Sequence, residues 1–257
     1  MKTPLVKIEI LSIYEKQKHK VLLPDRMAKC TPDTYKAIMN LKTELEGLHG
    51  KLILSDLFRS YDMQLQSHLD WKNKKKTAFS PPPGGSLHEA GRALDLDLGS
   101  IKITLAKFWP LAAKHGFFPI IDKPDPKMKE AWHFDRRGSH QKIYEYYTVG
   151  KGKNFKPYTA MAASAILSIN VKVDAFANSA VEASIQSGLI RLGHELGNMD
   201  GAIGNKTRNA LEQAGIPWTT KEQVLDAIES QLQDKFPEEY TVPDTGDESD
   251  IPGHVIQ

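Results

Sequence analysis

The alternation of apolar and polar positions predicts a chain that mixes strands with helices. Residues 5–23 alternate as in one or two strands. Thr31-Pro32-Asp33 is typical of a helix start, and apolar residues then recur at helical spacing as far as Gly50. Further strands are predicted at 51–58, 93–97, 117–121 and 131–134, and a further helix at 104–115. Since strands and helices do not alternate regularly, we expect an α+β fold, a small antiparallel sheet with flanking helices, followed by a small all-helical domain.

Changes in composition indicate where the domains end. Residues 72–85 combine a lysine cluster with three prolines and two glycines, which predicts a long exposed loop. Residues 150–154, GKGKN, are typical of a linker, and the pattern beyond them is helical. We therefore expect a first domain over residues 1–150, a linker over 151–160, a helical domain over 161–236 and an acidic, mobile tail over 237–257.

The composition restricts which kinds of metal site and partner are possible. The chain is 40% hydrophobic and 26% charged, as in an ordinary soluble protein with a core. Its single cysteine, Cys30, excludes an intrachain disulfide and a multi-cysteine metal site, so a metal would need histidine and carboxylate ligands. Residues 237–257 carry six acidic residues and no lysine or arginine. The whole chain has a net charge of +2, so the chain without this segment has a net charge of +8. A basic body suits a polyanion, whether nucleic acid or a cell wall.

No segment has the pattern of a secretory signal or of a membrane span. The N-terminal residues alternate apolar and charged side chains and lack a continuous apolar core. The longest weakly polar stretch, 160–173, is interrupted by polar residues and is too short to cross a bilayer. We expect synthesis in the cytoplasm without a signal peptide, and no membrane insertion.

Two histidines and an aspartate form a candidate zinc site, and they are His88, Asp95 and His133. Catalytic zinc is commonly held by three protein ligands of these types and keeps a fourth position for water. A turn at Gly91 would bring His88 and Asp95 together from the two sides of a loop-to-strand junction, while His133 would come from a separate strand. A lone histidine near an acid is more often a satisfied pair than a ligand, but the combination favours a metal site.

Glu130 is the candidate to take a proton from an attacking water, because a carboxylate beside a zinc site can act as a base. Three positions separate Glu130 from His133, which places the two residues on opposite faces of a straight strand. Glu130 must therefore lie just before the strand or at a bulge.

Three motifs together resemble a known family. They are R-S-x-x-x-Q at 59–64, S-x-H-x-x-G-x-A-x-D at 86–95 and E-x-W-H at 130–133. As a set they resemble the D-alanyl-D-alanine carboxypeptidases and dipeptidases, a family that includes the vancomycin-resistance D,D-peptidases and many phage endolysins. The resemblance covers residues 50–147. It implies a small α+β fold that binds zinc through the three ligands named above, with Glu130 as general base and acid.

The resemblance also implies roles for three residues around the metal. Arg59 would stabilise the substrate carbonyl and the developing oxyanion, a role suited to a fixed guanidinium. Ser86 and Gln64 would bind substrate, with Ser86 beside a substrate carboxylate. An equal alternative for Ser86 and Gln64 is that they only cap helices or turns.

The predicted helical domain resembles the small peptidoglycan-binding domain. Its signature, L-x-x-L-G followed by D-G-x-x-G-x-x-T, matches residues 189–193 and 200–207. Gly201 and Gly204 would allow left-handed turns between two helices, and Thr207 would cap the second helix. Residues 214–216 depart from the pattern, which commonly has an aromatic residue and a glutamine there. A helical bundle that only stabilises or dimerises the enzyme is therefore the alternative.

The preferred function is a zinc-dependent peptidase that cuts a peptide bond in the stem peptides or cross-links of bacterial peptidoglycan, as an endolysin or exported toxin does. The alternative is a D-alanyl-D-alanine carboxypeptidase or dipeptidase of cell-wall maintenance. The presence of Glu130 disfavours a non-catalytic zinc protein, and the lysine loop lacks the interleaved aromatic residues of a nucleic-acid site. We expect peptidoglycan as the partner, a monomer, and action on the cell wall after release or non-classical export.

Overall fold

The computed structural model describes residues 2–244, which form an α+β fold with a mixed sheet. The six strands of this sheet lie in the order β3 (His19–Leu22), β2 (Leu11–Lys16), β5 (Leu54–Asp56), β6 (Ala93–Leu96), β8 (His133–Arg136) and β7 (Phe117–Pro119). Strand β1 (Val6–Lys7) pairs separately with β4 (Lys29–Cys30). All neighbours are antiparallel except β2 and β5, which are parallel. The α+β class is confirmed, but the main sheet is mixed and not purely antiparallel.

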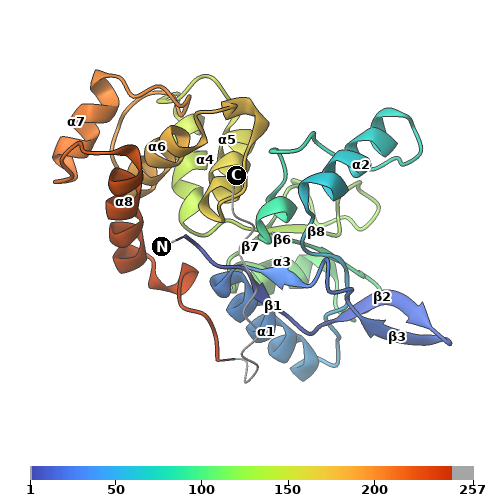
Figure 1. Ribbon diagram of the computed structural model, residues 1–257. Coiled ribbons are helices and arrows are strands. Elements are labelled where there is room, and N and C mark those ends of the chain that lie inside the picture. Colours follow the sequence, from blue (N-terminus) through green and yellow to red (C-terminus); the bar gives the residue numbers. More distant parts are fainter. Residues whose placement is uncertain (1, 245–257) are drawn as a thin grey trace.

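The helices fall into two groups (Figure 1). Those in the N-terminal part are α1 (Pro32–Gly47), α2 (Tyr61–Lys72) and α3 (Leu105–Lys114). Those that gather on the side away from the β2–β3 hairpin are α4 (Gln141–Thr148), α5 (Pro157–Ser168), α6 (Ala180–Leu192), α7 (Asn205–Gln213) and α8 (Lys221–Lys235). The 3-10 helices are η1 (Leu87–Ala90), η2 (Gly138–His140), η3 (Asp174–Phe176) and η4 (Pro237–Glu239). None of the described helices is long and apolar enough to cross a membrane.

The sheet and helices α1 and α3 enclose the first core. Helix α1 buries the predicted stripe of apolar residues, including Ile38, Leu41 and Leu45. Phe108 of α3 meets Phe134 of β8 edge to face, with ring centroids 5.2 Å apart. The sequence pattern did not predict helix α2. It begins after Ser60, whose Oγ accepts a hydrogen bond from Met63 N. Residues 72–85 otherwise form the expected loop, with turns and no strand.

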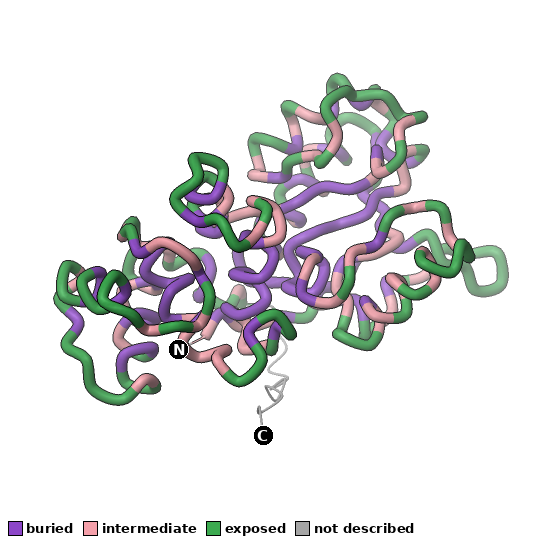
Figure 2. The backbone as a smooth tube through the Cα atoms, turned by 90° about the horizontal axis from the view of Figure 1, so that it is seen from above, coloured by how far each residue is buried: buried purple, intermediate pink, exposed green. Residues whose placement is uncertain are grey.

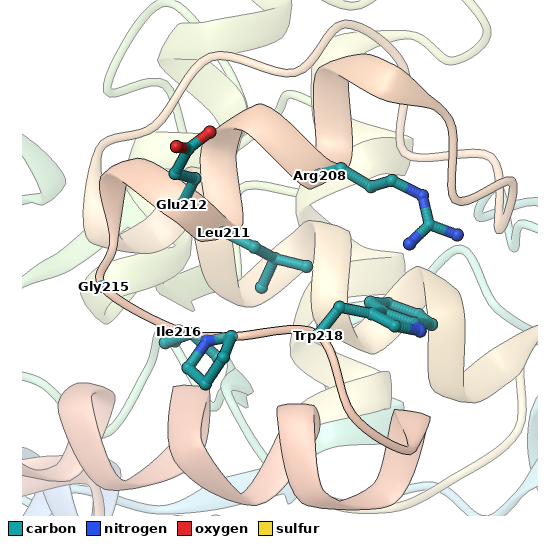
Figure 3. Close-up of a pocket in the computed structure, with 7 residues that line it drawn as sticks. Arg208, Leu211, Glu212, Gly215, Ile216 and Trp218 are labelled. Carbon is teal, nitrogen blue, oxygen red and sulfur yellow. The ribbon is translucent and has the colours of Figure 1, made fainter.

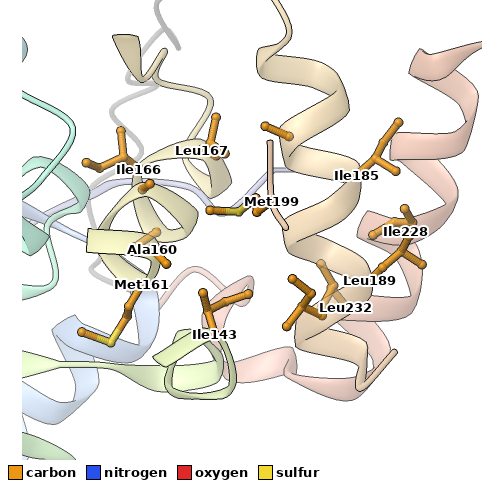
Figure 4. Packing of buried hydrophobic residues seen from close by; sticks show 14 of the residues in the cluster. Ile143, Ala160, Met161, Ile166, Leu167, Ile185, Leu189, Met199, Ile228 and Leu232 are labelled. Atoms are coloured by element: carbon orange, nitrogen blue, oxygen red, sulfur yellow. The ribbon is translucent and has the colours of Figure 1, made fainter. Parts of the chain in front are cut away.

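The second core joins the helical part to residues 87–93, beside the candidate ligand His88. Figure 4 shows Ile143 of α4 among side chains of α5, α6 and α8, and all belong to one buried cluster. Leu87, Ala90 and Ala93, which flank the candidate ligand His88, belong to the same cluster. Figure 2 shows the buried segments continuing from the helices into the strands. The helical part therefore shares a buried core with Leu87, Ala90 and Ala93 of the first part.

Two segments differ from the expected division of the chain. Helix α5 begins at Pro157, inside the range predicted as a linker. The predicted tail begins with packed residues, because Glu239 is fully buried and Tyr240 nearly so. Residues 245–257 lie outside the described residues. Both differences arise because a few buried side chains, which no compositional pattern marks, anchor otherwise polar segments.

Glu239 connects the two parts through a buried network of charges. Its carboxylate accepts hydrogen bonds from Ser139 N (2.6 Å), Ser139 Oγ (2.9 Å) and Arg191 Nη2 (2.7 Å), and lies 3.4 Å from Arg92 Nη2. Arg92 Nη1 in turn donates to Asp33 Oδ2 of α1 at 2.8 Å. Burial alone would raise the pKa of Asp33, but Arg92 and Arg136 outweigh this effect and hold it below its usual value. The network fixes the C-terminal segment against helix α1 and strand β6.

The glycine loop between α6 and α7 agrees with its prediction in part. Gly201 has the expected left-handed conformation, with φ of 78°. Gly204 is extended and is itself the residue that precedes α7, while Thr207 lies buried inside the helix and does not cap it. Gln186 Oε1 of α6 closes the loop by accepting hydrogen bonds from Asp200 N and Gly201 N.

Candidate metal centre and catalytic cleft

Strands β6 and β8 and the short helix η1 bring the three predicted ligands together. Asp95 and His133 are paired residues in the antiparallel ladder between β6 and β8. Helix η1 carries His88 and ends at Gly91, whose φ of 62° turns the chain into β6. A Cβ at Gly91 would lie 2.7 Å from Cys30 Cα, so this close turn requires glycine. The predicted turn at Gly91 is therefore confirmed.

The ligand atoms of His88, Asp95 and His133 lie within 4.8 Å of one another, and all three residues are buried. Asp95 Oδ1 is 3.3 Å from His88 Nε2 and 2.9 Å from His133 Nδ1. Two ring nitrogens and a carboxylate oxygen that converge in this way could hold a metal ion, and they are donors of the types that zinc accepts.

Each histidine directs one ring nitrogen toward this cluster because its other nitrogen is occupied. His88 Nδ1 lies 2.9 Å from the carbonyl oxygen of Leu57, to which it can donate. His88 Nε2 is buried and has no hydrogen-bond partner among residues 2–244. His133 Nε2 lies 2.9 Å from Asp135 Oδ1, which leaves Nδ1 beside Asp95. This pattern, with one nitrogen oriented by an oxygen acceptor and the other directed inward, is that of metal-ligating histidines, so the residues suit a metal ion.

The neighbouring carboxylates favour the protonated form of His133. Burial alone would lower the pKa of His133, but Asp135 and Asp95 raise it to about 10. Burial would raise the pKa of Asp95, but the charge of His88 and the charge and hydrogen bond of His133 hold it well below its usual value. A metal ion would displace the proton from His133 Nδ1, since a ligating imidazole is neutral.

Glu130 lies in the turn just before β8, the first of the two positions that the sequence left open. Its carbonyl oxygen accepts a hydrogen bond from His133 N at 3.0 Å, and its φ of 66° is left-handed, an uncommon conformation for a residue other than glycine. The side chain lines the same cleft as the three ligands. Burial raises the pKa of Glu130, and its Oε1 is buried without a hydrogen-bond partner in the described chain. A carboxylate in this state is suited to accept a proton.

Arg59 is fixed beside Asp95 by three oxygen atoms. Its Nε donates to Asp56 Oδ2 at 2.6 Å, its Nη1 donates to Gln64 Oε1 at 3.2 Å, and its Nη2 lies 3.6 Å from Asp95 Oδ2. Burial alone would lower the pKa of Arg59, but Asp56 and Asp95 raise it, so the guanidinium stays charged. Arg59 lines the cleft, where it can donate hydrogen bonds to a carbonyl or an oxyanion.

The two residues expected to contact substrate occupy different places. Ser86 lines the cleft, and its Oγ also caps η1 by accepting from His88 N at 3.3 Å. Gln64 is fully buried and does not contribute to the cleft lining. Its side chain holds Arg59 and donates to Ser80 Oγ and to the carbonyl oxygen of Pro81. Gln64 therefore supports Arg59 and the loop beside the cleft in this structure.

The cleft measures about 620 Å³ and lies between the two parts of the chain. One side comes from the metal site and the loop at 76–86. The opposite side comes from the helical part, through residues 155–163 and the segment at 173–175. Lys76 and Lys156 add positive charge from the two sides of the cleft. Within residues 2–244, neither lysine forms an ion pair with a carboxylate.

Asp135 and Tyr158 were not predicted to lie at the site, and Lys76 was considered only as part of the lysine run at 72–76, which could attract carboxylates of wall peptides. Asp135 follows His133 by two positions in β8, so the period of a strand could have suggested that both side chains lie on one face. Lys76 belongs to the lysine cluster, within which no local pattern distinguishes it. Tyr158 reaches Asp135 because α5 packs beside β8. The sequence carries no signal for this packing.

A second pocket, of about 370 Å³, lies on the helical part near α7 (Figure 3). It is lined by Leu211, Ile216 and Trp218, with Arg208 and Glu212 among the remaining lining residues. The Arg208 guanidinium carbon lies 4.7 Å from the centroid of the Trp218 ring. No group of possible metal ligands lies in this pocket among the described residues.

Comparisons with known proteins found similarity only among solved structures. No protein-family model and no curated protein matches the sequence. Among solved structures, the LD-carboxypeptidase LdcB, described with the molecular basis of its peptidoglycan recognition, aligns at a TM-score of 0.38 and 18% identity over 51% of this chain and 66% of that one. The L,D-carboxypeptidase DacB from Streptococcus pneumonia aligns at a TM-score of 0.33 and 21% identity over 52% of this chain and 85% of that one. The first alignment covers less than two thirds of its partner, and similarity at these TM-scores carries no argument about this chain.

Proposed function

We propose that this protein is a zinc-dependent peptidase that hydrolyses a peptide bond in the stem peptides or cross-links of bacterial peptidoglycan. One observation carries the proposal. The ligand atoms of His88, Asp95 and His133 converge in a cleft that Glu130 and Arg59 also line. The three motifs that resemble the D-alanyl-D-alanine peptidases supply these same five residues, which supports the substrate class.

The residues around the metal have complementary tasks in hydrolysis. Zinc, when bound, would supply a Lewis acid and lower the pKa of its water to about 7. Glu130, whose burial raises its pKa, accepts the proton of the attacking water and passes it to the leaving amine. Arg59, held by Asp56 and Gln64, donates to the oxygen that gains negative charge when the carbonyl is attacked.

The charges of the cleft support a substrate that carries carboxylates. Lys76 lies partly buried beside the site, where Glu130 and Asp95 are close enough to influence its pKa. Burial is the largest influence and lowers that pKa. Lys156 faces the same cleft from the helical part. Stem peptides carry free carboxylates on D-glutamate and at the C-terminus, and these lysines together with Ser86 are the groups that would bind them.

The test is mass spectrometry of purified peptidoglycan fragments after incubation with the zinc-loaded protein. The variant Glu130→Ala is compared with wild type, and the control is Glu238→Ala, which changes an exposed acid that does not line the cleft. We expect new products with the wild type and the control but not with Glu130→Ala, which should lose about 10² to 10⁴-fold in rate. The product masses identify loss of a terminal D-alanine or cleavage of an internal bond.

Metal dependence is tested separately from catalysis. Chelation should abolish hydrolysis and added zinc should restore it. His133→Ala should bind no zinc, whereas Glu130→Ala should bind it and remain inactive, because Glu130 is not a ligand in this arrangement. Full turnover by Glu130→Ala, cleavage that chelators leave unchanged, or zinc binding with no products from any wall fragment would each contradict the proposed peptidase.

A further inference from the structure

A chain of hydrogen bonds connects the helical part to the candidate metal ligand His133. Tyr158, in the first turn of α5, donates from its hydroxyl to Asp135 Oδ1 at 3.2 Å. The same oxygen lies 2.9 Å from His133 Nε2. Asp135 is fully buried, and its second oxygen has no hydrogen-bond partner among residues 2–244. The orientation of the Asp135 carboxylate therefore depends on the two contacts of Oδ1.

The orientation of Asp135 determines which nitrogen of His133 is available to a metal. A carboxylate that accepts from Nε2 keeps the proton on that nitrogen and leaves Nδ1, beside Asp95, as the ligand atom. Rotation of the carboxylate would remove the acceptor and free the ring to change its tautomer or its angle. The Tyr158 hydroxyl, which donates to the same oxygen, opposes this rotation.

We infer that Tyr158 is a positioning residue of the candidate metal site, which it acts on from the helical part through Asp135 and His133. This inference rests on the proposed zinc site. Residues 1–150 contain every proposed ligand, but the support for one ligand comes from α5, beyond the predicted domain boundary. The same helix contributes Thr159 and Ala163 to the cleft. The helical part is thus a structural component of the catalytic site, whether or not it also binds the wall.

The experiment measures zinc affinity by competition with a chelating dye for full-length wild type, Tyr158→Phe, Asp135→Asn and the double variant. The control is Tyr147→Phe, which removes the hydroxyl that bonds Asn154 and Met199 N inside the helical part. The melting temperature of each metal-free protein is recorded as a separate measure of folding. This design distinguishes a local effect on the metal from a general loss of stability.

We expect Asp135→Asn to weaken zinc binding by about 10 to 100-fold and Tyr158→Phe by a smaller factor of up to about tenfold. The double variant should match Asp135→Asn alone, because the tyrosine acts only through that carboxylate. Tyr147→Phe should lower the melting temperature and leave zinc affinity unchanged. Equal zinc affinity of wild type and Tyr158→Phe would overturn the positioning role, as would additive losses in the double variant. A wild type that binds no zinc would instead overturn the metal site itself.

Discussion

Removal of the buried carboxylate of Glu239 should destabilise the whole molecule, although this residue lies in a segment whose sequence is acidic and polar. In Glu239→Ala the buried guanidinium groups of Arg92 and Arg191 lose a counter-charge, and two hydrogen bonds from Ser139 lose their acceptor. Breaking a buried ion pair by removing one partner costs about 3 to 5 kcal/mol. Arg92 keeps its contact with Asp33, which limits the loss to this range.

The assay is equilibrium unfolding in urea, followed by tryptophan fluorescence and by circular dichroism. With an m-value of about 2.5 kcal/mol per molar, the unfolding midpoint of Glu239→Ala should fall by about 1.2 to 2 M. Glu238→Ala is the matched control, since its neighbouring carboxylate is exposed, and it should shift the midpoint by less than about 0.2 M. If Glu239→Ala proved as stable as Glu238→Ala, the buried network would not hold the two parts together as we have argued.

Three further perturbations test other parts of the structure. Lys76→Gln should lower kcat/KM about tenfold for stem peptides with free carboxylates and leave kcat/KM for amidated peptides unchanged. Lys75→Gln, which changes an exposed lysine, should leave kcat/KM unchanged for both substrates. Equal losses on both substrates in Lys76→Gln would contradict carboxylate binding. Asp33 has a lowered pKa in the folded state, so its contribution to stability is present above the ordinary value of 3.8 and is lost as the pH falls below it. Urea midpoints measured from pH 7 to pH 2.5 should therefore depend less steeply on acid pH in Asp33→Asn. Gly91→Ala should weaken zinc binding and destabilise the fold by about 1 to 3 kcal/mol, because its Cβ would collide with the β4 backbone; Gly99→Ala, which has room for a methyl group, should do neither.

The candidate ligands were predictable because they belong to short motifs with local geometry. A glycine three residues after His88 and four before Asp95 indicated a turn into a strand, and the structure forms that turn with a left-handed Gly91. The two-residue period of a strand restricted Glu130 to a position just before the strand or at a bulge. Only the structure decided between these positions, because a glutamate gives no sign in the sequence that its backbone is left-handed.

Contacts between distant segments explain where the structure differs from the composition of the chain. The lysine-rich and glycine-rich stretch at 150–154 suggested a flexible connection, yet α5 begins three residues after it and packs against the metal site. The acidic stretch after 236 suggested a tail, yet Glu239 is fully buried against two arginines. Composition describes the average preference of a segment for water, whereas one ion pair or one packed aromatic ring is enough to anchor it.

The sequence by itself predicted the α+β class, the three residues that converge in a possible metal site and the candidate base, because residue type and spacing within a few positions are sufficient for these predictions. The tertiary structure decided how the helical part lies relative to the candidate site residues. It placed α5 across the cleft, directed Tyr158 to Asp135, buried Gln64 behind Arg59 and left Lys76 facing the site. These relations join residues that are far apart in the chain, and they depend on which apolar surfaces pack together, a property of the whole fold that no local pattern contains.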